Sequence, residues 1–503
     1  MRNPFLHERP SGADLGLRSA SELLSMLRAK EVSSVELLDH YLERVDHLNP
    51  ALNAVVTLDT DRARRSAARA DDLRTGGDDD TLGLLHGLPM TVKDAIATAN
   101  VRSTGGASEL ADHHPETDAP AVAALKDQGA IVFGKTNLPR WSGDVQAYNE
   151  MFGQTNNPWD FSRGPGGSSG GASAAVAAGL TSVELGTDIG GSVRLPAHFS
   201  GVCAHKPSFG LVPQLGYLDH PTGGAVEPDV NVFGPIARSV SDLSLMLGVL
   251  AGPTPERQGA WQVTLPPSRH TDLTGFRVAA WLDDPTCPVA EDVHALLDQA
   301  TRTIEEAGAS VNRSARPEVP LSEVWEVGLP LVSAATSLGR TDTEYLKLVE
   351  QSEDVSLPQP LRMRAAASTL RHRDWLALND RRQIHRQQWQ QFFRDYDIVL
   401  CPVAFTTAFP HLQEGNLYTR TLQVDGVERP YADLIAWTTF IGYVYLPATV
   451  VPIGLTPAGL PVGIQIVAPY LEDATALRFA HLLETLLGGY TPPPMARLTA
   501  PRV

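Results

Sequence analysis

The chain has 503 residues, 43% of them hydrophobic, which is enough to bury a large core. Its 58 acidic and 41 basic residues give a formal net charge of −17, which argues against nonspecific binding to nucleic acid. Three cysteines in a chain of this length are not a disulfide framework, and their spacing is not that of a metal site.

No stretch of the sequence is apolar over the length of a membrane span, and the residues before Gly16 lack the apolar run of a signal peptide. We therefore expect a cytoplasmic protein that binds neither a membrane nor nucleic acid. No linker or internal repeat divides the sequence, so we expect a single domain over 1–503. A polar, proline-containing stretch at 254–267 marks the start of an expected peripheral subdomain, 255–395, that shapes the substrate pocket.

Predicted helices and strands alternate along the chain. Ser33 and Glu36 form a capping-box pattern that opens a helix, which we expect to end before Pro50. Short apolar runs predict strands at 52–57, 88–92, 130–133 and 182–185. Helices are predicted at 120–128, 172–178, 239–250, 293–304, 375–393 and 474–487. Further β-rich runs, at 398–400, 448–452 and 463–467, are expected to return to the main sheet, and the alternation predicts an α/β fold.

Lys93 follows the apolar run 88–92 and precedes Asp94. Taken alone, this position is typical of an exposed lysine at the end of a strand. To act as a base near neutrality, a lysine must shift its pKa from about 10.4 towards 7, which takes roughly 4–5 kcal/mol at about 1.36 kcal/mol per unit. Burial disfavours the ammonium form and produces such a shift. Lys93 is therefore a candidate base only if it is buried.

A loop expected at 164–171 contains the run Gly166-Gly167-Ser168-Ser169-Gly170-Gly171. The run matches the G-x-S-x-G nucleophile elbow, but an elbow follows a strand, and the proline-containing segment 157–165 cannot be one. It also begins like a phosphate-binding loop, but Ala172 stands where that loop needs its lysine. Packed elements predicted on both sides argue against a flexible linker.

Ser192 follows a predicted strand and the turn Asp188-Ile189-Gly190-Gly191. A strand, a tight glycine turn and a serine can direct successive backbone N–H groups at one point, which suits the oxyanion of a tetrahedral intermediate. Taken alone, Ser192 is equally typical of a helix N-cap.

Together, these three motifs resemble the amidase signature family, which includes bacterial amidases, aryl acylamidases and fatty acid amide hydrolase. The run from Gly153 to Pro207 resembles the family's core, and the runs 446–448 and 459–467 resemble its last pair of strands. The resemblance is strong over about 30–250, weak over about 255–395 and moderate beyond. It implies the amidase signature fold, an α/β architecture with a large mixed central β-sheet flanked by helices on both faces.

The resemblance also implies a Ser–cis-Ser–Lys triad. Ser192 would be the nucleophile, Ser168, at a non-proline cis peptide bond, would relay its proton, and Lys93 would be the final base. The oxyanion would be bound by the backbone N–H groups of Ile189, Gly190, Gly191 and Ser192. Three further residues match positions that brace the site: Ser169, Asp188 and Arg194.

The sequence departs from the family where such proteins shape the substrate pocket. Ala204-His205 replaces the usual Gly-Leu, and Tyr443-Val444-Tyr445 replaces the usual small residues. We expect His205 to pack or hydrogen-bond rather than to act as a base, because the triad is complete without it. Aromatic residues indicate a roomy apolar pocket, formed by Tyr443, Tyr445, Trp325 and Phe209.

We therefore expect an amidase that hydrolyses C–N bonds through an acyl-enzyme, with an alkaline pH optimum, and works as a monomer or homodimer without a metal or organic cofactor. Candidate substrates are small aryl or medium-chain amides, esters and carbamates (a urethanase-like activity). The alternative is the transamidating subunit of a tRNA-dependent amidotransferase, although Ile189 stands where such subunits usually have threonine. A third possibility, an inactive binding scaffold, is disfavoured by the intact triad positions.

Overall fold

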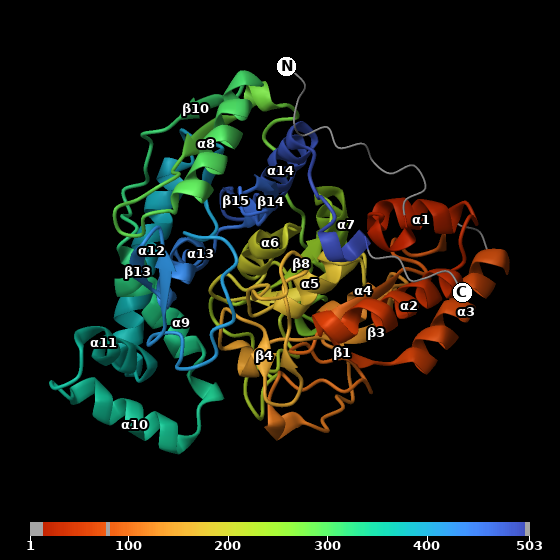
Figure 1. Ribbon diagram of the computed structural model, residues 1–503, viewed down its shortest axis with the longest axis horizontal. Coiled ribbons are helices and arrows are strands. Elements are labelled where there is room, and N and C mark those ends of the chain that lie inside the picture. Colours follow the sequence, from red (N-terminus) through yellow and green to blue (C-terminus); the bar gives the residue numbers. More distant parts are fainter. Residues whose placement is uncertain (1–13, 77–80, 498–503) are drawn as a thin grey trace.

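The computed structural model of the protein describes residues 14–76 and 81–497 (Figure 1). Within these residues an 11-stranded sheet forms the centre of the molecule. From one edge to the other, its strands are β1 (Val55–Leu58), β3 (Ile131–Thr136), β2 (Pro89–Lys93), β6 (Val183–Asp188), β8 (Val232–Ala237), β7 (Cys203–Lys206), β14 (Ala448–Leu455), β15 (Pro461–Val467), β11 (Ile398–Pro402), β9 (Arg277–Ala280) and β10 (Ser310–Asn312).

The sheet is mixed, as expected. β3, β2 and β6 run parallel to one another, and so do β11, β9 and β10. The central pairs from β6 to β8 and onward through β7, β14, β15 and β11 are antiparallel. Lys93 and Asp188 are therefore the last residues of two parallel neighbouring strands, which places both at the same edge of the sheet.

Both faces of the sheet are covered by buried apolar clusters. Successive side chains of a strand point to opposite sides of the sheet, so one strand contributes to both clusters. In β11, Ile398 and Leu400 belong to one buried apolar cluster, while Val399 and Cys401 belong to another. Such near-continuous apolar strands are typical of sheets with helices on both faces.

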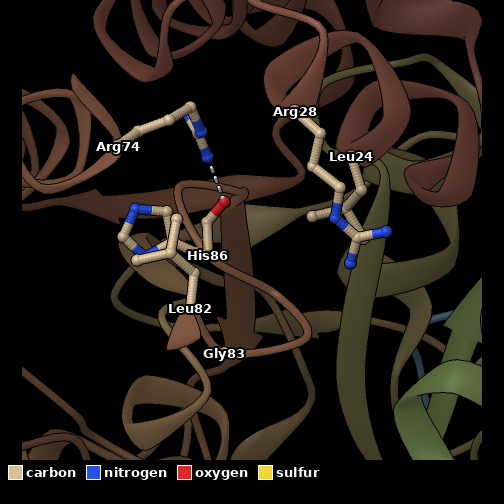
Figure 2. A pocket seen from close by; sticks show the side chains of 6 residues that line it. All are labelled: Leu24, Arg28, Arg74, Leu82, Gly83 and His86. Carbon is tan, nitrogen blue, oxygen red and sulfur yellow. Dashed lines mark hydrogen bonds between the residues drawn. The ribbon is translucent and has the colours of Figure 1, made fainter. Parts of the chain in front are cut away.

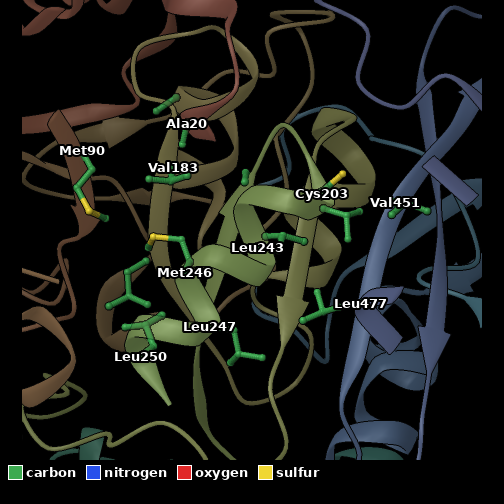
Figure 3. Packing of buried hydrophobic residues seen from close by; sticks show 14 of the residues in the cluster. Ala20, Met90, Val183, Cys203, Leu243, Met246, Leu247, Leu250, Val451 and Leu477 are labelled. Atoms are coloured by element: carbon green, nitrogen blue, oxygen red, sulfur yellow. The ribbon is translucent and has the colours of Figure 1, made fainter. Parts of the chain in front are cut away.

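The first cluster is covered mainly by α1 (Ala20–Arg28), α2 (Ser34–Leu52), α3 (Thr60–Gly76), α4 (Pro120–Asp127), α7 (Val240–Leu250), α8 (Glu291–Glu306) and α14 (Asp473–Leu487). Figure 3 shows how α7 packs in this layer, with Leu243, Met246 and Leu247 beside side chains from the sheet and from α14. Ser239 caps α7 by accepting from the N–H of Asp242, as predicted.

The second cluster is covered by α5 (Gly170–Ala177), α6 (Arg194–Ser200), α12 (His372–Phe392) and α13 (Ala436–Gly442). The two short helices α5 and α6 are buried along their whole length. They follow the two glycine-containing turns of the sequence, so this layer carries the candidate site.

The stretch 255–395 contributes to two parts of the molecule. Its first half supplies β9, α8 and β10 to the main sheet and its cover. Its second half is helical, with a π-helix at Val324–Gly328, α9 (Leu329–Ala335), α10 (Asp342–Glu353), α11 (Gln359–Ser368) and α12. In Figure 1, α10 and α11 lie at the lower left, away from α1–α4. The remaining strands form two small hairpin sheets: β4 (Tyr148–Asn149) with β5 (Gly153–Gln154), and β12 (Thr421–Val424) with β13 (Val427–Pro430).

Helix α2 begins with the predicted capping box of Ser33 and Glu36, but it does not end before Pro50 as expected. It continues to Leu52, whose side chain is fully buried. Asn53 then ends the helix in the left-handed conformation, with φ 53°. The burial of Leu52 offsets the backbone hydrogen bond that Pro50 cannot make, and β1 accordingly starts at Val55, later than predicted.

The glycine-rich loop is also shorter than expected, because α5 already starts at Gly170. A Cβ atom on Gly171 would lie 2.4 Å from the backbone nitrogen of Asn137. Glycine is thus needed here for close packing of the helix against the end of β3, and not for loop flexibility.

Candidate active site

Lys93, at the end of β2, is completely buried. Its Nζ donates to Ser168 Oγ at 2.6 Å and to Thr187 Oγ1 at 2.7 Å. Burial lowers the pKa of Lys93 well below its ordinary value, although the negative charges of Asp188 and Glu184 oppose the shift. The structure thus meets the condition set by the sequence: the lysine is hidden from solvent and bonded to a serine.

Ser168 lies in the loop before α5 and is completely buried. The Gly167–Ser168 peptide bond is cis, in agreement with the resemblance. The next residue, Ser169, fastens this loop to β6, because its Oγ donates to Thr187 O at 3.2 Å and accepts from Thr187 N at 3.3 Å. The loop and the end of β6 therefore form one unit around the amine of Lys93.

Ser192 lies in the turn between β6 and α6, and its residue surface is 8% exposed. Its carbonyl accepts from the N–H of Ser169 at 3.0 Å, so the backbone of Ser192 is held against the Ser168 loop. The preceding Gly191 has φ 122°, and a Cβ there would lie 2.4 Å from Thr438 Oγ1. Only glycine fits that position, and the tight turn presents the serine at the strand end.

Asp188 and Arg194 brace this turn as a fully buried ion pair. Arg194 Nε and Nη2 donate to the carboxylate of Asp188 at 2.9 and 2.8 Å. Burial alone would raise the pKa of Asp188, but the charge and hydrogen bonds of Arg194 outweigh it and hold that pKa at about 2. Arg194 Nη1 also donates to Thr438 O and Gln465 Oε1, both at 2.7 Å, and so connects the turn to α13 and β15.

Some backbone N–H groups of this turn donate to the carboxylate of Asp188, and others are candidates to bind an oxyanion. The N–H of Gly191 donates to Asp188 Oδ1 at 2.8 Å, and that of Val193 donates to Oδ2 at 3.1 Å. Of the four N–H groups predicted to bind an oxyanion, the one on Gly191 therefore serves the turn itself in this structure. The oxyanion assignment then depends on Ile189, Gly190 and Ser192.

Sequence reasoning missed three polar residues of this region. Thr187 is a direct partner of Lys93, and Thr438 donates to Gly190 O at 2.7 Å. Glu184 is completely buried in β6 and accepts from Thr91 Oγ1 and from Thr136 Oγ1, the latter at 2.9 Å. Thr187 and Glu184 lie in or just before the motif around Asp188, but Thr438 comes from a distant segment with no local signal.

His205 makes structural hydrogen bonds, as expected. Its ring nitrogens lie 2.9 Å from Thr449 Oγ1 and 3.1 Å from Asp473 Oδ1, and all three residues are completely buried. Asp473 also accepts from Ser208 Oγ at 2.6 Å. The group joins β7 to β14 and to the start of α14.

The four aromatic residues expected around the substrate have different surroundings. The rings of Phe209 and Tyr445 stack with centroids 4.2 Å apart, and both belong to a small apolar cluster that contains Ile189. Tyr443 is completely buried with its hydroxyl 2.9 Å from His385 Nδ1, and Trp325 packs against the second main cluster. Phe209 and Tyr445 therefore share a cluster with Ile189 of the turn that holds Ser192, whereas Tyr443 and Trp325 share one with Val193 of the same turn.

Other features of the described residues do not compete with this site. Figure 2 shows a small pocket lined by Leu24, Arg28, Arg74, Leu82, Gly83 and His86, where Arg74 donates to the carbonyl of His86 at 2.8 Å. Cys203, Cys287 and Cys401 are buried free thiols. In residues 14–76 and 81–497, no group of three or more His, Cys, Asp or Glu residues is placed to hold a metal ion. No helix in the described part of the chain has both the length and the apolar character to cross a membrane.

Comparison with known proteins agrees with this fold. A family model described as Amidase matches residues 36–477. The chain is 33% identical to the A subunit of the glutamyl-tRNA(Gln) amidotransferase of Burkholderia pseudomallei (strain 668), over 93% of this chain and 97% of that protein. A solved amidase is similar with a TM-score of 0.76 and 28% identity, covering 94% of this chain and 100% of its own. A bacterial aryl acylamidase has a TM-score of 0.78 and 24% identity, covering 94% and 97%.

The fold and the family match define an α/β enzyme that acts on carbon–nitrogen bonds. The chain belongs to the amidase signature family. The resemblance drawn from the sequence is thereby confirmed, and so is the predicted fold class.

Proposed function

We propose that the protein is a serine hydrolase that cleaves amides through an acyl-enzyme, with Ser192 as nucleophile, Ser168 as proton relay and Lys93 as base. The observation that carries this proposal is the 2.6 Å hydrogen bond from Lys93 Nζ to Ser168 Oγ, at a lysine with no solvent exposure. A buried amine favours its neutral form, and only that form can accept a proton.

In the first half of the reaction, the Ser192 oxygen bonds to the amide carbonyl carbon while its proton passes to Ser168 and the proton of Ser168 passes to Lys93. The negative charge that develops on the carbonyl oxygen is stabilised by backbone N–H groups of the Ile189–Ser192 turn. The same proton returns through Ser168 to the departing nitrogen, so the amine leaves neutral and Ser192 holds the acyl group. Water, deprotonated by the same relay, then releases the acid.

The substrates we propose are aryl or medium-chain amides, with esters and carbamates as further candidates. The stacked pair of Phe209 and Tyr445, in one apolar cluster with Ile189, supports an apolar or aromatic group next to the scissile carbonyl. An aromatic substrate is also supported by the name of one solved relative, an aryl acylamidase.

A panel of p-nitroanilides, phenyl esters and carbamates of varied acyl length, assayed with the wild type and two variants, tests this proposal. Ser192→Ala should abolish turnover, and Lys93→Ala should lower kcat on anilides by about 100- to 10,000-fold, the usual contribution of a positioned general base. Full anilide activity in Lys93→Ala would show that the proton relay is assigned wrongly. Circular dichroism of each variant checks that the fold survives.

A second candidate function is favoured by the 33% identity to a protein of a glutamyl-tRNA(Gln) amidotransferase. Such a protein would supply ammonia to a partner rather than hydrolyse small amides by itself. Ile189, where those proteins usually have threonine, argues against this assignment. Anilide hydrolysis by the pure chain would support the hydrolase, whereas glutaminase activity that appears only with added partner proteins would support the alternative.

A further inference from the structure

Beside the nucleophile turn lies a group of rings and guanidinium groups that the proposed reaction does not use, which we call the arginine–aromatic cluster: Phe209, Tyr445, Tyr470, Arg382 and Arg386. Tyr445 stacks on Phe209, and the hydroxyl of Tyr470 donates to Phe209 O at 2.9 Å. The guanidinium of Arg386 lies over both tyrosine rings, 4.9 Å from each centroid.

Two contacts connect the cluster to the turn that holds Ser192. Tyr445 and Phe209 pack in the same apolar cluster as Ile189, together with Val230 and Val332. Tyr445 also follows Gly442 by three residues and donates its N–H to that carbonyl at 2.9 Å. A Cβ on Gly442 would lie 3.8 Å from the carbonyl oxygen of Ile189, so this backbone runs close to the turn.

The backbone of this region is strained at two non-glycine residues. Val230 has φ 67° and Tyr445 has φ 73°, both in the left-handed region that β-branched and bulky residues rarely adopt. Such strain concentrates at ligand sites, where the surrounding structure enforces it. Val230 and Tyr445 lie in one small cluster next to the nucleophile turn. Their strain supports a ligand site there, independently of the charges of the two arginines.

The two arginines differ in how their charge is satisfied. Arg382 is 2% exposed and donates twice to the carboxylate of Asp229, at 3.0 and 2.8 Å. Arg386 is partly buried, and its only side-chain hydrogen bond within the described residues goes from Nη1 to the neutral Gln383 Oε1 at 2.9 Å. No acidic side chain in residues 14–76 or 81–497 forms an ion pair with it. The cluster therefore carries one positive charge more than it neutralises.

We propose that Arg386 is a substrate-binding residue, and that the physiological substrate is an amide with a carboxylate several bonds away from the scissile carbonyl. The aromatic pair of Phe209 and Tyr445 holds the apolar stretch between the two groups. The planar guanidinium, which lies over two tyrosine rings, would bind the carboxylate with its remaining N–H groups, a pairing for which arginine is well suited. This inference rests on the proposed amidase function and narrows its substrate class.

Matched substrates that differ only in the carboxylate test the proposal. Glutaryl-p-nitroanilide is compared with valeryl-p-nitroanilide for a carboxylate on the acyl side, and N-butyryl-4-aminobenzoate with butyrylanilide for one on the amine side. The wild type should prefer the carboxylate member of at least one pair by about 10-fold or more, mainly through KM, since a hydrogen bond to a charged group contributes that much. Arg386→Gln should remove the preference, because it slows the carboxylate member of the pair much more than the neutral one.

Two further variants separate binding from a structural effect. Arg386→Lys should restore part of the preference, because it keeps the charge. Arg381→Gln is the matched control: Arg381 is on the same helix, but it already pairs with Glu323 and Glu326, so its loss should leave the preference unchanged. Absence of any carboxylate preference in the wild type, or equal slowing of both members of a pair by Arg386→Gln, would overturn the proposal.

Calorimetry makes the outcome independent of turnover. Glutaric acid monoanilide, or N-butyryl-4-aminobenzoate, titrated into Ser192→Ala should bind about 10-fold more weakly when Arg386→Gln is added. If the wild type hydrolyses no anilide but this difference in binding is present, the proposed reaction fails and the carboxylate site stands. If neutral anilides are hydrolysed and neither acid shows the difference, the site fails and the proposed reaction stands.

Discussion

At the scale of single residues, the protonation of Lys93 depends on two buried carboxyl groups of β6. The charge of Asp188 is already shared with Arg194, two of whose nitrogens lie within 2.9 Å of it. Within the described residues, the side chain of Glu184 has only the hydroxyls of Thr91 and Thr136 as hydrogen-bond partners. It lies on the same face of the sheet as Lys93, because Thr91 pairs with Glu184 in the register. Asp188 raises the pKa of Lys93 more than Glu184 does, but Glu184 can be changed without breaking the ion pair of Asp188 and Arg194.

This arrangement predicts a specific pH dependence of kcat/KM. Lys93 accepts a proton only when neutral, so the rate should rise with pH through the pKa of Lys93 and be highest on the alkaline side. The negative charge of Glu184 raises the pKa of Lys93, so Glu184→Gln should move this rise to lower pH. The effect requires the ionised form of Glu184, which predominates above about pH 8, so the profiles should be compared in that range.

The matched control is Asp242→Asn, which also removes a completely buried carboxylate, but from α7 on the other side of the sheet. Asp242 accepts from the N–H of Ala20 at 2.8 Å, so its loss should affect stability and leave the pH profile in place. A wild-type rate that peaks in mild acid, or a Glu184→Gln profile that overlays the wild type, would contradict the prediction.

At the scale of elements, Arg194 joins four of them, because its guanidinium bonds β6, α13 and β15 from the start of α6. Arg194→Met should therefore destabilise the protein by about 3–5 kcal/mol, since it leaves the buried carboxylate of Asp188 without its partner. Urea unfolding measures the loss. The double variant Asp188→Asn/Arg194→Met should lose less than Arg194→Met alone, and an additive loss would show that the buried charge is not the cause.

Elements that follow from local interactions were predicted well. The capping box of Ser33 and Glu36 and the cap at Ser239 involve residues three positions apart, so the sequence shows them directly. The predicted end of α2 was wrong. The helix continues because the burial of Leu52 among its tertiary neighbours stabilises it more than Pro50 destabilises it. The strand order, which puts β9 and β10 at an edge next to β11, depends on long-range pairing that no local pattern contains.

The candidate site shows the same difference between local features, which the sequence reveals, and long-range contacts, which it does not. The sequence singles out Lys93, Ser168 and Ser192 because they belong to short motifs of unusual composition. The structure places Lys93 against Ser168 and holds the backbone of Ser192 to the Ser168 loop. Thr438 and Arg386 could not be found in this way, because only the folded chain brings α13 to the turn that holds Ser192 and α12 to Tyr445.

At the scale of the whole molecule, buried carboxyl groups make stability depend on pH in two opposite ways. Burial would raise the pKa of Asp188, but Arg194 holds it at about 2, below the ordinary 3.8. Its contribution to stability is therefore present above about pH 4 and is lost as the pH falls towards 2. Burial raises the pKa of Glu184 from 4.5 to about 8, against the opposing effects of Thr91 and Thr136, so the folded state holds a proton there that the unfolded chain has released.

Between about pH 4.5 and 8, the folded state of the wild type should therefore lose stability relative to a variant that cannot ionise at this position. Glu184→Gln keeps the size of the side chain and removes the ionisation, so its melting temperature relative to the wild type should rise across this window and stay level above it. The corresponding free energy is on the order of a few kcal/mol, from about 1.36 kcal/mol for each unit of pKa difference. Scanning calorimetry of both proteins from pH 4 to 9 measures the difference. Parallel melting curves over this range would mean that the folded and unfolded states bind the same number of protons at Glu184, so that burial does not raise its pKa.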